Sequence, residues 1–315
     1  MKVTVLGAGN VGATCAQRIL EKDLADVYLV DVVEGLAEGK ALDLAQAAPL
    51  LGTSRRINGG TSYDGASGSD IVVITAGKPR TPGMSREDLL TINGKIVASL
   101  ARQAAAVAPG AFVIVVTNPL DITTYIAGRV MDLPRERVMG MAGLLDTARF
   151  RTFIGWQLGC SATDVTAMVL GGHGDSMVPI VSHATVGGVP LTQLVPPDVL
   201  EAIVQRTRDG GAEVVKLLKT GSAFYAPGAA VADMVGAILN DQKRLVPVSA
   251  KLDGEYGMDG IFLGVPVLLG AGGVESVVEM TLPEAELAAL KASGDAVRAA
   301  MEMWSSLAGD DPAGW

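Results

Sequence analysis

A glycine-rich segment near the N-terminus constrains the fold of this chain more than any other feature of its sequence. The segment reads GAGNVG at 7–12, follows a short apolar run at 2–6 and precedes apolar residues at helical spacing. A second apolar run at 27–30 ends at Asp31, which lies 22 residues after Gly9. This order of strand, G-x-G-x-x-G, helix, strand and acidic residue is typical of a dinucleotide-binding unit.

Each part of this unit has a physical reason. Gly7 permits the tight turn, Gly9 lets the backbone approach a pyrophosphate, and Gly12 allows the helix to pack closely on the strand. The helix N-terminus offers unpaired N–H groups and a partial positive charge to the phosphates. A carboxylate at Asp31 accepts hydrogen bonds from ribose hydroxyls and repels a 2′-phosphate, so the predicted cofactor is NAD. The alternative is a glycine-rich turn that binds nothing.

Further apolar runs extend the same alternation of strands and helices. Those at 70–75 and 112–117 are nearly continuous, as expected for parallel strands that are buried on both faces. The run at 138–141 is expected to close the sheet. The sequence predicts an α/β protein with an N-terminal Rossmann doubly wound parallel sheet and a C-terminal α+β substrate domain. We place the NAD-binding domain at 1–142 and the substrate domain at 143–315, with ligands at the carboxyl ends of the strands.

Composition excludes several other classes of protein. The net charge of −9 disfavours nucleic-acid binding, which needs a basic face. No apolar run reaches the roughly 18 residues that a membrane span needs. The two cysteines and two histidines have no metal-ligand spacing, so neither a metal site nor a disulfide framework is predicted. We therefore expect a cytoplasmic protein in which Cys15 and Cys160 are small buried residues.

Four segments carry polar side chains where functional loops are expected. They are 78–88 with Arg80 and Arg86, 117–121 with Asn118, 144–149 with Asp146 and Arg149, and 171–175 with His173. Asp146 and Arg149 are three residues apart and share one face if this stretch is helical. The alternatives are solvated loop charges at Arg80 and Arg86, a surface ion pair at Asp146 and Arg149, and a structural histidine at His173.

Taken together, five ordered segments make the chain similar to a known family. GAGNVG, TAGKPRTPGMSR, TNPLD, LLDTAR and GGHGD occur in one order along nearly the whole chain. In this respect the chain resembles the lactate/malate dehydrogenase superfamily, and within it the lactate-dehydrogenase-like malate dehydrogenases. The resemblance implies an NAD-dependent, reversible oxidation of (S)-malate to oxaloacetate. The alternatives are a dehydrogenase of lactate or another 2-hydroxy acid, and a non-catalytic NAD-binding sensor.

The resemblance also implies roles for individual residues. His173 is the expected proton acceptor, with an unperturbed pKa near 6.5, and Asp146 is its carboxylate partner. Arg149 is expected to bind the C1 carboxylate of the substrate, and Arg86 to polarise the reacting carbonyl. Asn118 is expected to hydrogen-bond the substrate oxygen near the nicotinamide. The peptide bond between Asn118 and Pro119 is expected to be cis.

The resemblance implies that Arg80 decides the substrate. The matching position is Gln in lactate dehydrogenases, whereas malate dehydrogenases carry Arg there. An arginine binds the second carboxylate of oxaloacetate bidentately, and pyruvate would leave it unpaired. Ala223 is expected to contribute a smaller side chain than the threonine of lactate dehydrogenases. The implied cofactor contacts are Gly7, Gly9, Asn10, Val11, Gly12, Asp31, Thr75, Ala76, Gly77, Asn93, Thr117 and Asn118. The resemblance further implies a homo-oligomer, with a tetramer favoured over a dimer.

The remaining expectations concern the second half of the chain. We expect a strand at 164–170 that delivers the histidine, and a kinked helix or two helices at 197–219. A capping box at 281–284 is expected to begin a final helix with an apolar stripe that belongs to the core, and 305–315 is expected to be frayed. Of the other candidate residues, Asp175 is expected to orient the histidine loop and His183 to be structural, whereas no role follows from the sequence for Asp121.

Overall fold

The fold is described here from a computed structural model, which covers residues 1–79 and 84–315. Arg80 lies outside the described residues. The strands are β1 (Lys2–Leu6), β2 (Asp26–Val30), β3 (Ile57–Gly60), β4 (Ile71–Ile74), β5 (Phe112–Val115), β6 (Val138–Gly140), β7 (Val165–Thr166), β8 (Val169–Leu170), β9 (Val178–Pro179), β10 (Thr185–Val186), β11 (Val189–Pro190), β12 (Arg244–Asp253), β13 (Asp259–Gly270) and β14 (Gly273–Val277).

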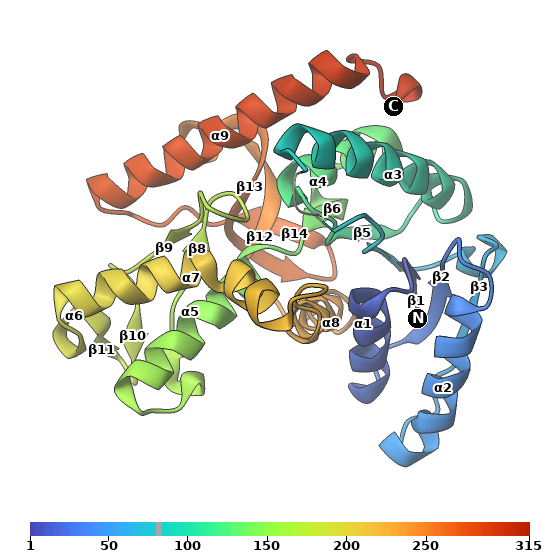
Figure 1. The fold of residues 1–315 in the computed structure, drawn as a ribbon, viewed down its shortest axis with the longest axis horizontal. Helices are drawn as coiled ribbons and strands as arrows, with labels where there is room; N and C mark the ends of the chain where they lie inside the picture. Colours follow the sequence, from blue (N-terminus) through green and yellow to red (C-terminus); the bar gives the residue numbers. More distant parts are fainter. Residues whose placement is uncertain (80–83) are drawn as a thin grey trace.

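Helices connect several of these strands (Figure 1). They are α1 (Asn10–Glu21), α2 (Leu36–Leu51), α3 (Arg86–Val107), α4 (Leu120–Met131), α5 (Gly143–Leu158), α6 (Leu191–Leu194), α7 (Pro197–Leu218), α8 (Tyr225–Leu239) and α9 (Glu284–Ala308). Short 3-10 turns occur at Asp64–Ala66, Arg135–Arg137, Ala162–Asp164, Glu255–Gly257 and Pro312–Gly314. None of the helices in the described ranges is both long and apolar enough to cross a membrane.

The first half of the chain forms the parallel sheet that the sequence predicts. Its strands lie in the order β3-β2-β1-β4-β5-β6, and every neighbouring pair is parallel. The central strand β1 is buried from Val3 to Leu6, and its register places Val5 opposite both Leu29 and Val73. This order is that of a doubly wound dinucleotide-binding sheet, so the predicted fold class is confirmed.

The expectation that the run at 138–141 closes the sheet is wrong. Beyond β6, the sheet continues through β12, β13 and β14, which pair antiparallel, with Ser249 of β12 opposite Gly140 of β6. The long apolar strands of the second half cover the backbone edge that β6 would otherwise expose to water. A division at residue 142 is therefore a division of the chain and not of the sheet.

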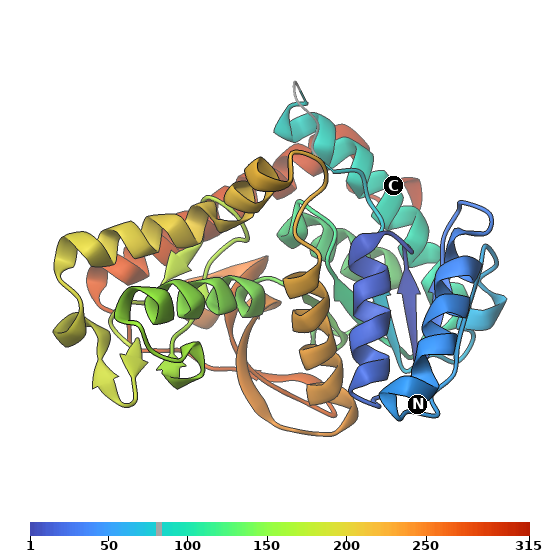
Figure 2. The same cartoon turned by 60° about the horizontal axis from the view of Figure 1, so that its bottom comes forward.

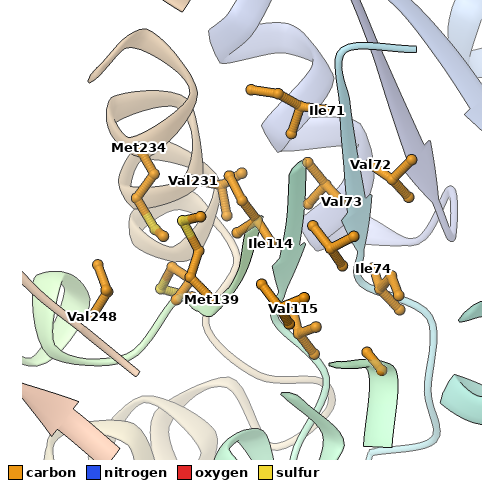
Figure 3. Close-up of a cluster of buried hydrophobic side chains, with 14 of the residues drawn as sticks. Ile71, Val72, Val73, Ile74, Ile114, Val115, Met139, Val231, Met234 and Val248 are labelled. Carbon is orange, nitrogen blue, oxygen red and sulfur yellow. The ribbon is translucent and has the colours of Figure 1, made fainter. Parts of the chain in front are cut away.

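Helices cover both faces of this sheet. α1, α2 and α8 lie on one face, and α3, α4 and α9 lie on the other (Figures 1 and 2). On the α8 face, Val231 and Met234 point toward Ile114 and Met139 of the parallel strands (Figure 3). Val248 of β12 borders the same cluster, so one continuous core joins the two halves of the chain.

The other elements of the second half form a smaller unit beside the sheet. α5 and α7 pack together there, next to the short sheets β11-β10-β7 and β8-β9 (Figure 1). The expected strand at 164–170 is interrupted, because β7 pairs with β10 whereas β8 pairs with β9. Helix α7 is a single helix that includes Gly210 and Gly211, so the two-helix alternative is wrong.

The end of the chain differs from the sequence prediction in two respects. Helix α9 begins at Glu284 with Pro283 as its N-cap and no side-chain cap, so the predicted capping box is wrong. A residue that precedes proline is disfavoured in the helical region, which delays the start of the helix beyond Leu282. The tail is not frayed: Trp315 is only 6% exposed, and its ring lies 5.6 Å from that of Trp304.

The apolar stripe of α9 belongs to the core as predicted, since Leu290, Val297 and Trp304 are buried. The two cysteines differ from each other. Cys15 is fully buried, and burial raises the pKa of its thiol far above the usual value, whereas Cys160 is partly exposed. The prediction that both are buried is therefore correct for Cys15 alone.

Candidate active site

The glycine-rich loop between β1 and α1 has the geometry that its sequence predicts. Gly7 has a φ of +106°, and a Cβ atom there would lie 2.7 Å from the backbone nitrogen of Ala76. A Cβ atom on Gly12 would lie 1.8 Å from the Gly7 carbonyl oxygen, so only glycine fits at either position. A Cβ atom on Gly9 would meet nothing within 4 Å, which means that the backbone of Gly9 borders open space.

Asp31 follows β2 directly and lies against this loop. One carboxylate oxygen accepts the Ala8 N–H at 2.7 Å and the other accepts the Val33 N–H at 3.0 Å. Helix α1 begins at Asn10 after the N-cap Gly9, which has no side chain to cap the first turn. The free N–H groups of that turn and the carboxylate beside it form a cradle that fits the phosphates and ribose of a dinucleotide.

Lys40 is a cradle residue that the sequence analysis missed. Its Nζ donates to the carbonyl oxygen of Ala8 at 2.7 Å, so a side chain from the beginning of α2 contacts the glycine-rich loop. A single lysine on a surface helix gives no signal in the sequence, since only the fold brings it to the loop.

The ends of β4 and β5 add further predicted cofactor residues to the same edge. The hydroxyl of Thr75 donates to the Gly7 carbonyl at 3.0 Å, and the hydroxyl of Thr117 donates to the Ala76 carbonyl at 2.8 Å. A Cβ atom on Gly77 would lie 2.6 Å from the Thr117 side chain. These contacts fix the carboxyl ends of two neighbouring strands relative to the glycine-rich loop.

Asn93 of α3 is fully engaged with the protein. Its amide oxygen accepts the Lys78 N–H at 2.8 Å, and its amide nitrogen donates to the Asn118 carbonyl at 2.6 Å. Asn93 therefore braces the two loops that follow β4 and β5. Its direct contact with a cofactor stays a prediction. The Asn118–Pro119 bond is cis, as expected, and Asn118 is exposed at the same edge.

A buried cluster of three side chains lies at the start of α5. His173 Nδ1 is 2.8 Å from Asp146 Oδ2, and Arg149 Nη1 donates to Asp146 Oδ1 at 3.0 Å. Asp146 is thus shared by a histidine and an arginine, each bound to a different oxygen. The predicted trio is brought together by the fold, and the alternative of a surface ion pair is wrong because Asp146 is only 2% exposed.

The surroundings of His173 set its protonation. Burial alone would lower the pKa of the imidazole, but the charge and hydrogen bond of Asp146 oppose this. Asp121 adds a smaller effect in the same direction, while the positive charge of Arg149 acts against it. The net result is a pKa for His173 that is raised above 6.5.

Glycines position the loop that carries the histidine and the helix that faces Arg149. Gly171 has a φ of +84° and exchanges backbone hydrogen bonds with Gly264 of β13. In the middle of α7, a Cβ atom on Gly210 would lie 3.1 Å from the Arg149 side chain. Arg149 therefore lies between α5 and α7 in space that the missing side chain of Gly210 provides.

The other predicted site residues lie at the rim. Arg86, the first residue of α3, pairs with Asp175 at 2.5 Å, and both side chains are largely exposed. Asp175 thus contacts the first residue of α3, and its expected role in orienting the histidine loop stays a prediction. Ala223 is half-buried in the connection between α7 and α8. His183 is exposed, with Nδ1 2.8 Å from the Ser182 hydroxyl.

Asp121 also belongs to this site, although no role for it follows from the sequence. This buried side chain in the first turn of α4 accepts the backbone N–H of His173 at 2.8 Å and the hydroxyl of Ser249 at 2.7 Å. No group of three or more potential metal ligands occurs among residues 1–79 and 84–315.

A dinucleotide cradle and a buried histidine–carboxylate pair at one edge of a parallel sheet define the class of the protein. The cradle can bind a nicotinamide cofactor, and the histidine can exchange a proton with a substrate beside it. The chain is thus of the class of nicotinamide-dependent oxidoreductases.

Comparisons with known proteins identify the family. Residues 1–140 match the family described as lactate/malate dehydrogenase, NAD binding domain, and residues 144–307 match its alpha/beta C-terminal domain. The chain belongs to the lactate/malate dehydrogenase family, and its cofactor is NAD.

Individual relatives are similar over nearly their whole length. A malate dehydrogenase of Chloroherpeton thalassium is 54% identical over 98% of this chain and 99% of its own. The solved malate dehydrogenase of Salinibacter ruber is 48% identical with a TM-score of 0.93, over 98% of each chain. A lactate dehydrogenase of Cryptosporidium parvum, complexed with lactic acid and NAD, is 42% identical with a TM-score of 0.93, over 96% of each chain.

Proposed function

We propose that this chain catalyses the reversible, NAD-dependent oxidation of (S)-malate to oxaloacetate. The observation that carries the proposal is the shared carboxylate of Asp146, which holds both His173 and Arg149 beside the dinucleotide cradle. The similarity of the chain to relatives named malate dehydrogenase supports malate as the substrate. In this proposal residues 1–142 bind the cofactor, and residues 143–315 form the substrate domain that supplies the catalytic His173 and Asp146.

The chemistry divides between the cofactor and the histidine. Held by the glycine-rich loop and Asp31, bound NAD would supply the hydride acceptor for C2 of malate. Because Nδ1 of His173 pairs with Asp146, the Nε2 atom is the one that accepts the proton of the C2 hydroxyl. The resulting imidazolium is stabilised by the Asp146 carboxylate, and in the reverse reaction it returns the proton to the oxygen of oxaloacetate.

The arginines bind and polarise the substrate. Arg149 uses only one of its five N–H donors on Asp146, so the remaining donors can bind the C1 carboxylate bidentately. Arg86 polarises the reacting carbonyl oxygen, and Asn118 hydrogen-bonds the same oxygen. Arg86 can exchange Asp175 for the substrate, because the ion pair between these two residues is exposed to water and contributes little stability.

Substrate choice rests on Arg80, with a smaller contribution from the short side chain of Ala223. The overall fold does not distinguish oxaloacetate from pyruvate as the substrate, because a lactate dehydrogenase has the same fold with a TM-score of 0.93. A guanidinium at position 80 pairs with the second carboxylate of oxaloacetate, whereas the methyl group of pyruvate would leave it unpaired.

The test of the proposal is a panel of substrates with purified protein. We expect kcat/KM for oxaloacetate with NADH to exceed that for pyruvate by at least about 10³-fold, the cost of an unpaired buried charge. Arg80→Gln should lower oxaloacetate turnover and raise pyruvate turnover, and Arg80→Lys, which keeps the charge without the bidentate geometry, should give an intermediate loss. A wild-type preference for pyruvate contradicts the proposed substrate.

Cofactor contacts in this proposal come from the glycine-rich loop, Asp31 and the ends of β4 and β5. The carboxylate of Asp31 binds the ribose hydroxyls and repels a 2′-phosphate. We expect Asp31→Ser to raise the relative use of NADPH, while the same change at Asp43, an exposed carboxylate of α2, leaves it unaltered. A wild-type enzyme that prefers NADPH would contradict this assignment.

We further propose that the chain forms a homo-oligomer, with a tetramer favoured over a dimer, in the cytoplasm. Large apolar side chains lie exposed on α2, α5 and α7, including Leu50, Trp156 and Leu217, and such surfaces favour association. The partly exposed thiol of Cys160 suits a reducing compartment. Sedimentation equilibrium tests the assembly, and a monomer at micromolar concentration would contradict it.

A further inference from the structure

Asp121 is a buried carboxylate that the mechanism above does not use. It is only 6% exposed, and each of its oxygens accepts one hydrogen bond. One accepts the backbone N–H of His173 at 2.8 Å, and the other accepts the hydroxyl of Ser249 at 2.7 Å.

These two bonds join three separate parts of the fold. Asp121 lies in the first turn of α4, two residues after Pro119 and three after the substrate-binding residue Asn118. Ser249 belongs to β12, beside β6, and His173 belongs to the loop after β8. The Asp121 side chain therefore fixes the distance between the segment of Asn118 and the backbone of the histidine.

Burying an ionised carboxylate only to hold two segments together costs free energy. Burial raises the pKa of Asp121, and the bonds from Ser249 and the His173 backbone, together with the charge of His173, only partly oppose this. A neutral asparagine could make two hydrogen bonds of the same geometry without the cost of burying a charge. The negative charge is therefore expected to have a use of its own.

The charges around the imidazole show what that use is. In the described structure, Asp146 and Arg149 face the ring from α5, and Asp121 faces the same loop from α4. Asp175 lies on the histidine loop itself, but it is exposed and pairs with Arg86. Arg149 offsets part of the attraction that Asp146 exerts on a protonated ring, and the negative charge of Asp121 restores a part of that attraction.

We propose that Asp121 is a positioning residue for His173, which holds the histidine backbone opposite Asn118 and whose negative charge stabilises the imidazolium formed during malate oxidation. The inference rests on the proposed function for the catalytic role of His173. It extends that function by a second carboxylate, which acts through the histidine and does not touch the substrate.

The experiment separates the charge from the hydrogen bonds. In Asp121→Asn, the amide oxygen can still accept the His173 N–H, and the amide nitrogen can donate to the Ser249 hydroxyl, so only the charge is lost. Asp132→Asn is the matched control, because it makes the same change at an exposed position at the other end of α4.

The scarcity of histidine makes the readout simple. The chain has only His173 and His183, so a proton NMR titration shows two imidazole signals, and His183→Gln assigns them. We expect Asp121→Asn to lower the pKa of His173 and to move the acidic limb of kcat/KM for malate oxidation to lower pH by the same amount. The value of kcat should fall about 10-fold, which is less than the roughly 10²–10⁴ that the general base itself contributes, with KM for NAD unchanged.

A second variant covers the case in which Asp121→Asn does not fold. Ser249→Ala removes the donor that favours the ionised form of Asp121, so it should lower the pKa of His173 in the same direction by a smaller amount. Unchanged titration of His173 in the folded Asp121 variant, or in Ser249→Ala if only that variant folds, overturns the proposal. The titration needs no turnover, so a wild-type protein inactive on malate would overturn the proposed function and leave this test intact.

Discussion

Two arginine–carboxylate pairs near the candidate active site differ in how far water reaches them. Arg149 and Asp146 are 3.0 Å apart, with side chains that are 15% and 2% exposed. Arg86 and Asp175 are closer, at 2.5 Å, yet their side chains are 77% and 83% exposed. The shorter pair is the weaker one, because water screens exposed charges, and breaking a buried pair leaves a charge without a partner.

This difference assigns different work to the two pairs. The buried pair is held in place before any substrate arrives, since Asp146 is also bound to His173 and Arg149 is packed against Gly210. The exposed pair can exchange partners at small cost. The site thus has a fixed interior, formed by Asp146, Arg149 and His173, and an exchangeable rim, formed by Arg86 and Asp175.

The largest effect is expected for the proton acceptor in the fixed interior. His173→Asn should lower kcat for malate oxidation by about 10³-fold, because a positioned general base contributes roughly 10²–10⁴. Steady-state kinetics measures it, with His183→Asn as the control, since His183 is exposed and its ring nitrogen pairs with the neighbouring Ser182 hydroxyl. Near-normal turnover of His173→Asn would remove His173 from the mechanism, whereas a wild-type protein with no turnover on any 2-hydroxy acid would favour the non-catalytic NAD-binding sensor.

The second effect concerns the shared carboxylate. Asp146→Asn should lower kcat by about 10²-fold, since the imidazolium loses its main counter-charge and Arg149 loses a partner. The pKa of His173 is raised in the native protein, so the acidic limb of malate oxidation lies above pH 6.5. Removing the negative charge destabilises the protonated ring, lowers that pKa and moves the limb to lower pH.

A limb that stays in place in Asp146→Asn would show that Asp146 does not control the titration of His173. The pH profile of oxaloacetate reduction provides an internal check. That direction needs the protonated ring, so the alkaline limb should move to lower pH in the same variant.

A smaller effect is expected where α7 packs on Arg149. A Cβ atom on Gly210 would lie 3.1 Å from the Arg149 side chain, so Gly210→Ala should displace the guanidinium and raise KM for malate. We expect a rise of about 10-fold, the equivalent of about 1.4 kcal/mol. Gly211→Ala is the matched control, because its Cβ atom would make an ordinary contact at 3.6 Å.

Thermal stability separates this effect from general damage to the helix. Alanine in a helix interior is more favourable than glycine by about 1 kcal/mol, so Gly211→Ala should be at least as stable as the wild type. An unchanged KM in Gly210→Ala would mean that Arg149 tolerates the extra methyl group.

The smallest effect is expected at the exchangeable rim. Asp175→Asn should change kcat/KM by less than about 5-fold, since exposed ion pairs contribute about 0–1 kcal/mol. Wild type and variant should differ less at high salt than at low salt, because salt screens exposed charges. A loss beyond about 100-fold in Asp175→Asn would break the contrast between the two pairs.

The sequence predicted the parts of the molecule that depend on neighbouring residues. The G-x-G-x-x-G turn, its strands and Asp31 lie within one continuous stretch, and Asp146 and Arg149 are three residues apart on one helix. In both cases local spacing fixes the geometry, so the cradle and the carboxylate–arginine pair were recognisable. The exceptions are local too: the predicted capping box failed because Pro283 delays the helix start.

Contacts between distant segments could not be predicted in this way. Asp121 lies 52 residues from His173 and 128 from Ser249, and no spacing rule connects them. The packing of Trp315 on Trp304 depends equally on where α9 lies. The role of Arg80 still rests on the sequence resemblance, because this residue lies outside the described part of the chain.

The amino-acid sequence alone predicted the parallel dinucleotide-binding sheet, the cofactor that it suits and the residue types of the site. Hydrophobic periodicity and the positions of glycines are properties of short segments, so they can be recognised in the sequence without the fold. The tertiary structure decided that β12–β14 complete the sheet, which side chains are shielded from water and which carboxylate braces the histidine. Burial and long-range pairing depend on the packing of the whole chain, and burial is what separates the fixed charges of this site from the exchangeable ones.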